Sequence, residues 1–169
     1  SMNPIFSTIN QAQGRTGYGG TKQDWGTVEV RSGAHMFWWL YYANPPGQPN
    51  DFDIYSKPLV IWLQGGPGLA SSGLGNFIEI GPIDLEGNPR NTTWVHDYNV
   101  LFIDAPVGAG FSYTESTDAF NTQDSQIATD VIFCLRNFLR IFPSFQTVPT
   151  YIVGQSYGGR TAANIAWKL

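Results

Sequence analysis

Residues 150–159 read Thr-Tyr-Ile-Val-Gly-Gln-Ser-Tyr-Gly-Gly, an apolar run that leads into the pattern Gly-x-Ser-x-Gly. The run 150–153 predicts a β-strand, and the alanines and isoleucine that follow Ser156 predict a helix. A sharp turn between a strand and a helix lifts a serine hydroxyl above the end of the strand, and glycines on both sides let the backbone close up. The pattern predicts Ser156 as a catalytic nucleophile; a plain Gly/Ser turn in a nucleotide-binding sheet is the alternative.

Two earlier segments have the pattern of buried strands. Residues 58–63 and 99–104 are short runs that are apolar on both faces, which is typical of parallel strands inside a sheet. Residues 122–141 carry apolar side chains at spacings of three and four, and Pro143 follows, so they predict an amphipathic helix that can cross over between strands. The alternation of strands and helices predicts an α/β sheet with right-handed crossovers.

The N-terminal part of the chain predicts a different start to this sheet. Residues 27–31 and 35–42 read as two strands, and Ser32-Gly33 between them suits the turn of an antiparallel hairpin. Residues 1–23 are rich in Gly, Gln, Thr and Asn without periodicity, so we predict a loose arm there. The folded domain is then expected to span residues 24–169.

The composition of the 169 residues excludes several functions. Charged residues make up 13% and the net charge is −4, so no basic stripe is available for nucleic acid. The longest apolar stretch, residues 36–43, is too short for a membrane span, which takes ~20 residues. Cys134 is the only cysteine, which rules out an internal disulfide, and we interpret it as a buried helix residue. We predict neither a metal nor a cofactor.

Asn91-Thr92-Thr93 is a glycosylation sequon in a turn-like stretch, where an acceptor asparagine would be exposed. Such triplets also occur by chance. The sequon alone therefore leaves passage through the secretory pathway open.

A second glycine-rich loop supports the chemistry expected at Ser156. The tetrahedral intermediate of a serine hydrolase needs two backbone N–H donors, one from the residue after the nucleophile and one from a loop after an earlier strand. Tyr157 and Gly66 fit these roles, because the loop 65–68, Gly-Gly-Pro-Gly, follows the strand 58–63. An ordinary turn or a phosphate loop is the alternative, but the Lys-Ser/Thr ending of a P-loop is missing.

Four ordered blocks of the chain resemble the serine carboxypeptidases, a family of α/β-hydrolases. The blocks are residues 62–72, 76–82, 101–113 and 154–159. The resemblance covers residues 25–169 and is nearest to the retinoid-inducible branch, with the vitellogenic-like carboxypeptidases next. It implies the N-terminal half of an α/β-hydrolase sheet, truncated just after the turn at Ser156. It also implies a lysosomal or extracellular enzyme that releases C-terminal amino acids from peptides with a free C-terminus, usually at acidic pH, through an acyl-enzyme on Ser156.

The resemblance also implies a site for the terminal carboxylate of the substrate. The corresponding positions here are Gln64, Glu79 and Gln155, but the family normally has glutamate in place of Gln155. A carboxylic acid donates a hydrogen bond to a carboxylate only while it is protonated, whereas an amide donates at every pH. We therefore expect peptidase activity to persist to higher pH than is usual in the family; weakened carboxylate recognition or lost peptidase function is the alternative.

The base of the expected triad is missing from this sequence. In α/β-hydrolases the chain order is Ser, then Asp or Glu, then His, and no acidic residue or histidine follows Ser156. His35 and His96 precede the nucleophile and are interpreted as structural. We expect the chain to be the N-terminal part of a larger enzyme, inactive alone, with the strand 151–153 at an uncovered edge and a C-terminal chain or segment supplying Asp and His. An acyltransferase or esterase of the same fold, or a non-catalytic peptide-binding fragment, are the alternatives.

Overall fold

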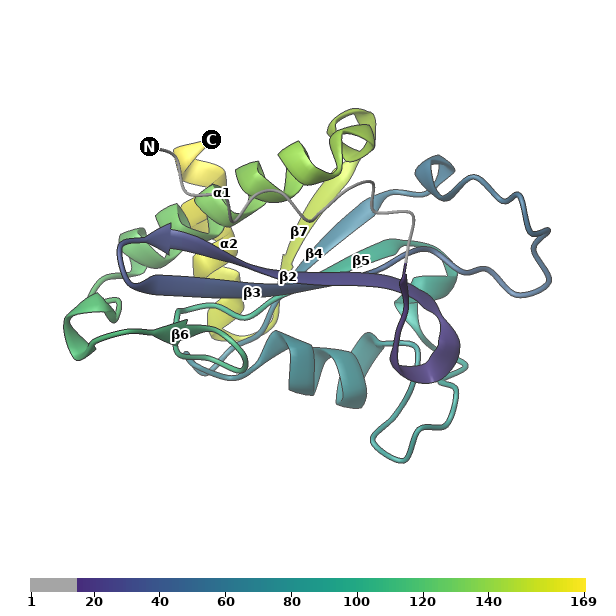
Figure 1. Ribbon diagram of the computed structural model, residues 1–169, viewed down its shortest axis with the longest axis horizontal. Coiled ribbons are helices and arrows are strands. Elements are labelled where there is room, and N and C mark those ends of the chain that lie inside the picture. Colours follow the sequence, from purple (N-terminus) through teal and green to yellow (C-terminus); the bar gives the residue numbers. More distant parts are fainter. Residues whose placement is uncertain (1–14) are drawn as a thin grey trace.

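The computed structural model describes residues 15–169 (Figure 1). In that part the strands form one mixed sheet in the order β1-β2-β3-β5-β4-β7, with β6 paired to β3. The strands are β1 (Arg15–Thr16), β2 (Lys22–Arg31), β3 (Ala34–Tyr41), β4 (Leu59–Leu63), β5 (Asn99–Ile103), β6 (Tyr113–Thr114) and β7 (Thr150–Gly154). The longer helices are the π-helix η4 (Ser71–Ile80) and the α-helices α1 (Asp124–Ile141) and α2 (Tyr157–Lys168). Short 3-10 turns are η2 (Tyr18–Gly20), η3 (Ile54–Ser56), η5 (Trp94–His96), η6 (Thr117–Ala119) and η7 (Pro143–Thr147).

The sheet begins with the predicted hairpin and continues with the predicted parallel strands. Strands β2 and β3 pair antiparallel, and Gly33 in the turn between them has φ +69°, a conformation that favours glycine. Strand β3 pairs antiparallel with β5, and β5, β4 and β7 run parallel. The chain crosses from β5 to β7 through α1, so β4 lies between two parallel neighbours. The predicted α/β architecture is confirmed.

Helices cover both faces of the sheet, with α1 and α2 on one face and η4 on the other (Figure 1). The period of two along a strand sends alternate side chains of β5 into two separate clusters. Leu101 and Ile103 belong to the larger cluster, under α1 and α2. Val100 and Phe102 belong to the smaller one, which includes Ile80 of η4. All residues of β4 and β5 are buried as a result, which explains why both strands are apolar throughout.

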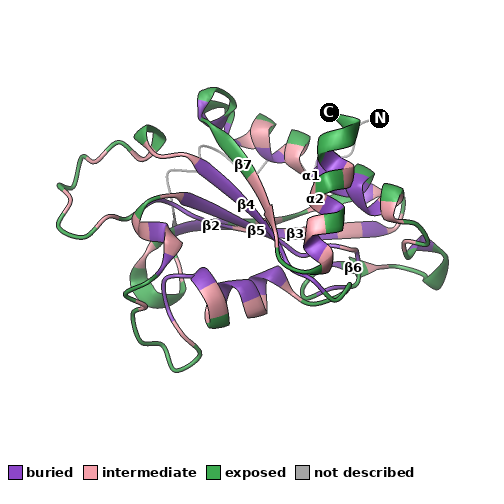
Figure 2. Cartoon of the chain, turned by 180° about the vertical axis from the view of Figure 1, so that it is seen from behind, coloured by how far each residue is buried: buried purple, intermediate pink, exposed green. Residues whose placement is uncertain are grey.

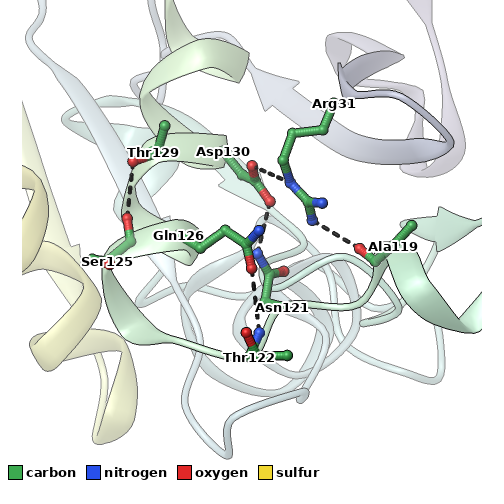
Figure 3. A network of polar contacts seen from close by, with 8 residues as sticks. All are labelled: Arg31, Ala119, Asn121, Thr122, Ser125, Gln126, Thr129 and Asp130. Carbon is green, nitrogen blue, oxygen red and sulfur yellow. Dashed lines mark hydrogen bonds and ion pairs between the residues drawn. The ribbon is translucent and has the colours of Figure 1, made fainter.

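A partly buried ion pair joins α1 to the hairpin (Figure 3). The guanidinium Nε of Arg31 lies 2.8 Å from Oδ1 of Asp130, and its Nη2 donates to the carbonyl of Ala119 at 2.8 Å. The other Asp130 oxygen accepts from Asn121 Nδ2 at 2.9 Å. The side chain of Asp130 is fully buried, so these donors replace the water that its charge would otherwise need.

Strand β7 lies at an edge of the described sheet, as the sequence predicted. Its only strand partner among residues 15–169 is β4. Its residues are exposed or half-buried, and Tyr151 exposes 56% of its surface (Figure 2). An apolar edge strand with free backbone groups is a site where further strands can pair.

The structure corrects the predicted loose arm over residues 15–23; residues 1–14 lie outside the described part. Strand β1 pairs with β2, which begins at Lys22, ahead of the predicted strand at 27–31. Gln23 is buried, donates to the carbonyl of Tyr18 at 2.8 Å and accepts from the indole of Trp39 at 2.8 Å. This segment is held in place by its contact with β3, a strand that comes later in the chain. The polar, glycine-rich composition of the segment does not reveal that contact.

Candidate active site

Ser156 stands on the strained turn that the sequence predicts between β7 and α2. Its backbone has φ 54° and ψ −120°, and among residues 15–169 it is the one non-glycine residue with positive φ. An added Cβ on Gly154 would lie 2.2 Å from the carbonyl carbon of Gly158. An added Cβ on Gly158 would lie 2.1 Å from the carbonyl oxygen of Leu63. Only glycine fits at positions 154 and 158, two residues before and after Ser156. Backbone strain like that of Ser156, on the order of 1–3 kcal/mol, concentrates at functional positions. We call residues 154–158 the elbow.

The loop after β4 lies against the elbow. Because β4 and β7 pair in parallel with Leu63 opposite Gly154, their carboxyl ends emerge side by side. An added Cβ on Gly65 would lie 2.9 Å from the Cβ of Ser156, and Gly66 next to it has φ +115°. Tyr157 opens α2, so its N–H is one of the first-turn donors without an intrahelical acceptor. The structure thus brings the loop with Gly66, the N–H of Tyr157 and the hydroxyl of Ser156 to one edge of the sheet.

The three residues expected at a carboxylate site form one hydrogen-bonded chain. The indole Nε1 of Trp62 donates to Oε1 of Gln64 at 2.8 Å. Nε2 of Gln64 donates to Oε1 of Glu79 at 2.9 Å and to Oε1 of Gln155 at 3.3 Å. Gln64 is 5% exposed, Glu79 is half-buried and Gln155 is exposed next to Ser156. The structure therefore gathers Gln64, Glu79 and Gln155 as a group beside the nucleophile; their roles remain predictions.

The helix η4, which carries Glu79, was not predicted, and neither was the residue that anchors it. Asp104, buried at the end of β5, accepts hydrogen bonds from the N–H and the hydroxyl of Ser72 at 2.9 and 2.7 Å. The same carboxylate accepts from the N–H of Phe111 at 3.0 Å, and burial raises its pKa above the ordinary range of aspartate. Asp104 thus ties the start of η4 to the loop after β5. The apolar run before Asp104 predicts where the strand ends, but nothing in the sequence indicates that Asp104 bonds Ser72 and Phe111.

A second anchor holds the first turn of α2. The hydroxyl of Tyr157 donates to Asp124 at the start of α1, and Arg160 Nη2 lies 2.7 Å from the other carboxylate oxygen. The Arg160 guanidinium stands 5.4 Å from the centre of the Tyr157 ring. The hydrogen bond to Asp124 raises the pKa of the Tyr157 phenol. The residue after the predicted nucleophile is therefore fixed through its side chain, a contact between two helices that sequence reasoning did not find.

The two histidines lie away from this group. His35 in β3 contacts Glu115 at 2.8 Å and stacks on Tyr113 at 4.5 Å. His96 lies in η5, which precedes β5 and so stands at the amino edge of the parallel strands, opposite the elbow. Neither histidine hydrogen-bonds Ser156 among the contacts of residues 15–169, and that neither is the base stays a prediction. Asn91 of the sequon is exposed in a turn.

Comparison with known proteins decides the family. The family model described as serine carboxypeptidase matches residues 14–169. The chain belongs to the serine carboxypeptidase family. It is 50% identical to the retinoid-inducible serine carboxypeptidase of Mus musculus over 148 residues, which cover 88% of this chain and 32% of that protein. It is 41% identical to serine carboxypeptidase-like 51 of Arabidopsis thaliana over 147 residues, 86% of this chain and 31% of that protein.

A solved structure of the family has the same fold. A prohormone-processing carboxypeptidase from Saccharomyces cerevisiae superposes with a TM-score of 0.72 at 25% identity, over 88% of this chain and 34% of that one. The chain spans about a third of the length of the curated relatives it matches. The predicted family, its retinoid-inducible branch and the α/β-hydrolase fold are confirmed.

Within residues 15–169, no helix has both the length and the apolar character that a membrane crossing requires. In the same range, His, Cys, Asp and Glu side chains do not gather in threes as a metal site would need.

Proposed function

We propose that this serine carboxypeptidase chain carries the nucleophile and the substrate-carboxylate site of an enzyme that releases C-terminal amino acids from peptides. The observation that carries the proposal is the juxtaposition of strained Ser156 with the Gln64, Glu79 and Gln155 group. An exopeptidase needs a nucleophile and a terminal-carboxylate site next to each other. An esterase or acyltransferase of the same fold does not require the second element.

In the proposed reaction, the Oγ of Ser156 attacks the carbonyl carbon of the last peptide bond while a general base takes its proton. The developing oxyanion accepts hydrogen bonds from the N–H groups of Gly66 and Tyr157. The C–N bond then breaks, the leaving amine takes the proton, and the terminal amino acid departs. Water hydrolyses the remaining ester and restores the Ser156 hydroxyl.

The base itself is proposed to come from outside residues 1–169. The 13 residues after Ser156 contain no Asp, Glu or His, whereas the triad of this fold places both partners after the serine. A C-terminal chain or segment that supplies them would also cover the exposed edge of β7. Loss of triad partners typically costs several orders of magnitude in rate, so we expect no measurable turnover from the 169 residues alone.

A two-part assay tests these statements. A fluorophosphonate that labels reactive serines and a peptide with a free C-terminus are given to the 169-residue chain and to the full-length protein that contains it. We expect labelling and turnover only from the full-length protein, and loss of both in its Ser156→Ala variant. Robust turnover by the short chain would overturn the assignment of the base. An esterase would be favoured instead if the full-length protein hydrolyses esters and its turnover does not depend on whether the substrate's C-terminal carboxylate is free or blocked.

Gln155 is proposed to extend activity toward higher pH. Its amide donors persist at every pH, whereas a glutamate at that position stops donating when it ionises. We expect the alkaline limb of kcat/KM for the full-length protein to lie at higher pH than that of its Gln155→Glu variant. Superimposable alkaline limbs would show that the amide has no such role.

The proposed compartment is the secretory pathway, with a lysosomal or extracellular destination. The supporting observations are the family and the exposed position of Asn91 within its sequon. On expression in secreting cells, we expect an N-glycosidase to reduce the apparent mass of the protein by more than that of an Asn91→Gln variant. Identical shifts for the two proteins would contradict the glycan at Asn91.

A further inference from the structure

The asparagine of the sequon stands on the rim of a hollow at the end of the sheet opposite the elbow. The hollow has a volume of about 770 Å³, within the range of small-molecule sites, roughly 300–1,000 Å³. Its walls come from η2, from the loop 44–54 between β3 and β4, and from the segment 91–96 that contains η5. These three segments lie at the same end of the sheet (Figure 1). Asn91 is one of the lining residues and is exposed.

The chain is fixed on both sides of Asn91. Before it, the Arg90 guanidinium donates to two carbonyls at the end of η4, at 2.6 and 3.1 Å. After it, the buried hydroxyl of Thr93 donates to the carbonyl of Ile80 at 2.7 Å and accepts from the N–H of Val95 at 3.2 Å. A group attached to Asn91 therefore starts from a fixed position at this rim.

The loop 44–54, which forms the opposite wall, is tied to its surroundings at its two ends. The N–H of Asn44 donates to the carbonyl of Val95 at 2.7 Å, and Nδ2 of Asn99 donates to the carbonyl of Ile54 at 2.9 Å. In the described part of the chain, residues 45–52 form hydrogen bonds only within the loop. The middle of the loop therefore has hydrogen-bonding capacity left for a ligand in the hollow.

The lining combines ring surfaces with polar side chains, which suits a sugar. A pyranose has C–H groups on its faces and hydroxyls around its edge, and N-acetylglucosamine, the first sugar of an N-glycan, adds an acetamide. The amide of Asn50, the imidazole of His96 and the ammonium of Lys22 each offer an N–H donor to sugar oxygens. The rings in the wall are those of Pro46, Pro49 and Phe52.

We propose that the glycan of Asn91 folds back into this hollow, with its first N-acetylglucosamine packed between the segment 91–96 and the loop 44–54. The inference rests on the proposed glycosylation of Asn91. A second hollow, of about 730 Å³, also reaches Asn91, but its walls include Tyr151 and Val153 of β7. In the proposed full-length enzyme, the segment that covers the edge of β7 lies there. The glycan thus links two segments that are far apart in the sequence and holds the loop 44–54 in place.

Hydrogen exchange of the full-length protein tests the inference. The protein and its Asn91→Gln variant are made in the same secreting cells, so that they differ in this glycan alone. We expect the amides of the loop 44–54 to exchange roughly two- to tenfold faster in the variant, the effect of losing about one net hydrogen bond. Trimming the protein with an endoglycosidase that leaves the first sugar should keep the slow exchange, because that sugar makes the proposed contacts.

The loop 84–88 is the internal control for this measurement. It is nearer to Asn91 in sequence than the loop 44–54 is, but it does not line the hollow. A glycan that extends into solvent has no reason to protect the more distant loop. We expect the loop 84–88 to exchange at the same rate in both proteins.

A change in the wall of the hollow identifies the contact. Phe52→Ser removes a ring from the wall, so the difference in exchange between the glycosylated and Asn91→Gln forms should shrink. Tyr55→Ser, in η3 and outside the hollow, is the matched control and should keep the full difference. An undiminished difference with Phe52→Ser would show that the sugar does not pack against this wall.

The outcomes separate this inference from the proposed glycosylation. Mass spectrometry of the peptide that contains Asn91 reports whether it carries a glycan; if it carries none, both proposals are overturned. If the glycan is present and the loop 44–54 exchanges equally fast in both proteins, glycosylation stands and the position in the hollow is wrong. Equal slowing of both loops by the glycan would show general shielding and would overturn the inference as well.

Discussion

Replacement of Gly158 by alanine tests how closely the elbow packs on β4. The added methyl carbon would lie 2.1 Å from the carbonyl oxygen of Leu63 and 3.0 Å from that of Gln64. Both are backbone atoms, and β4 is held by hydrogen bonds to β5 on one side and β7 on the other. The neighbours cannot rotate out of the way as a flexible side chain would.

The expected size of the effect is the difference of two terms. Alanine in place of glycine stabilises a helix by up to about 1 kcal/mol. Overpacking of a well-packed site costs typically 1–3 kcal/mol, and more against rigid backbone. We expect a net loss of about 2 kcal/mol for Gly158→Ala, the larger overpacking cost less the helix gain, and hence a lower Tm. Movement of the elbow should also reduce kcat more than it changes KM.

Gly159 supplies the matched control one residue later in the same helix. An added Cβ there would lie 3.7 Å from the carbonyl oxygen of Gly154, an ordinary contact. Gly159→Ala should therefore keep the helix gain of up to about 1 kcal/mol and raise Tm. Circular dichroism melts and urea titrations of the full-length protein measure both variants. Equal Tm values for the two variants would refute the close packing of Gly158 on β4.

Three further outcomes are expected. Arg31→Met leaves the buried Asp130 carboxylate without its ion-pair partner and should destabilise the fold by about 3 kcal/mol, with Asp130→Asn in the same chain recovering part of the loss; urea titration of the single and double variants checks this. Burial raises the pKa of Cys134 to about 12, so the thiol should react with a disulfide reagent only on unfolding. Because the unfolded thiol ionises first, stability should fall above its ordinary pKa by up to about 1.4 kcal/mol per pH unit, and Cys134→Ala should lack that part of the decline. Tyr157→Phe and Asp124→Asn should each lower kcat several-fold, and their effects should not add in the double variant; additive losses would show that their contact does not position the first turn of α2.

The elements predicted from local patterns are those that form where expected. The predicted strands 58–63 and 99–104 contain β4 and β5, which are buried. The predicted helix 122–141 contains α1, which begins two residues later because Gln123 is extended. Hydrophobic periodicity suffices here, since each of these segments buries its apolar side chains against the sheet in the simplest way. The elbow was predictable for another reason. Gly154 is crowded by Gly158, only four residues later, and Gly158 is crowded by Leu63 of the neighbouring strand β4, so both positions need glycine.

The segments that escaped prediction depend on distant partners. Helix η4 is rich in glycine and serine, and it forms where the Asp104 carboxylate holds Ser72. An added Cβ on Gly75 would lie 2.4 Å from Trp62 Nε1, so this glycine lets the helix approach the indole. Residues 15–23 are likewise ordered by β2 and β3. None of these partners has a fixed spacing in the sequence that a pattern could reveal.

The amino-acid sequence by itself determined which chemical groups the candidate site contains: a serine in a glycine-flanked turn, a glycine loop, and an amide at position 155. Those are properties of residue type and local spacing. Only the tertiary structure decided which way the amides point. That direction starts from the donor-only indole of Trp62 and passes through Gln64 to two side chains on other elements, Glu79 and Gln155. Hydrogen-bond polarity is a property of contacts, so it exists only once the sheet has brought the carboxyl ends of β4 and β7 together.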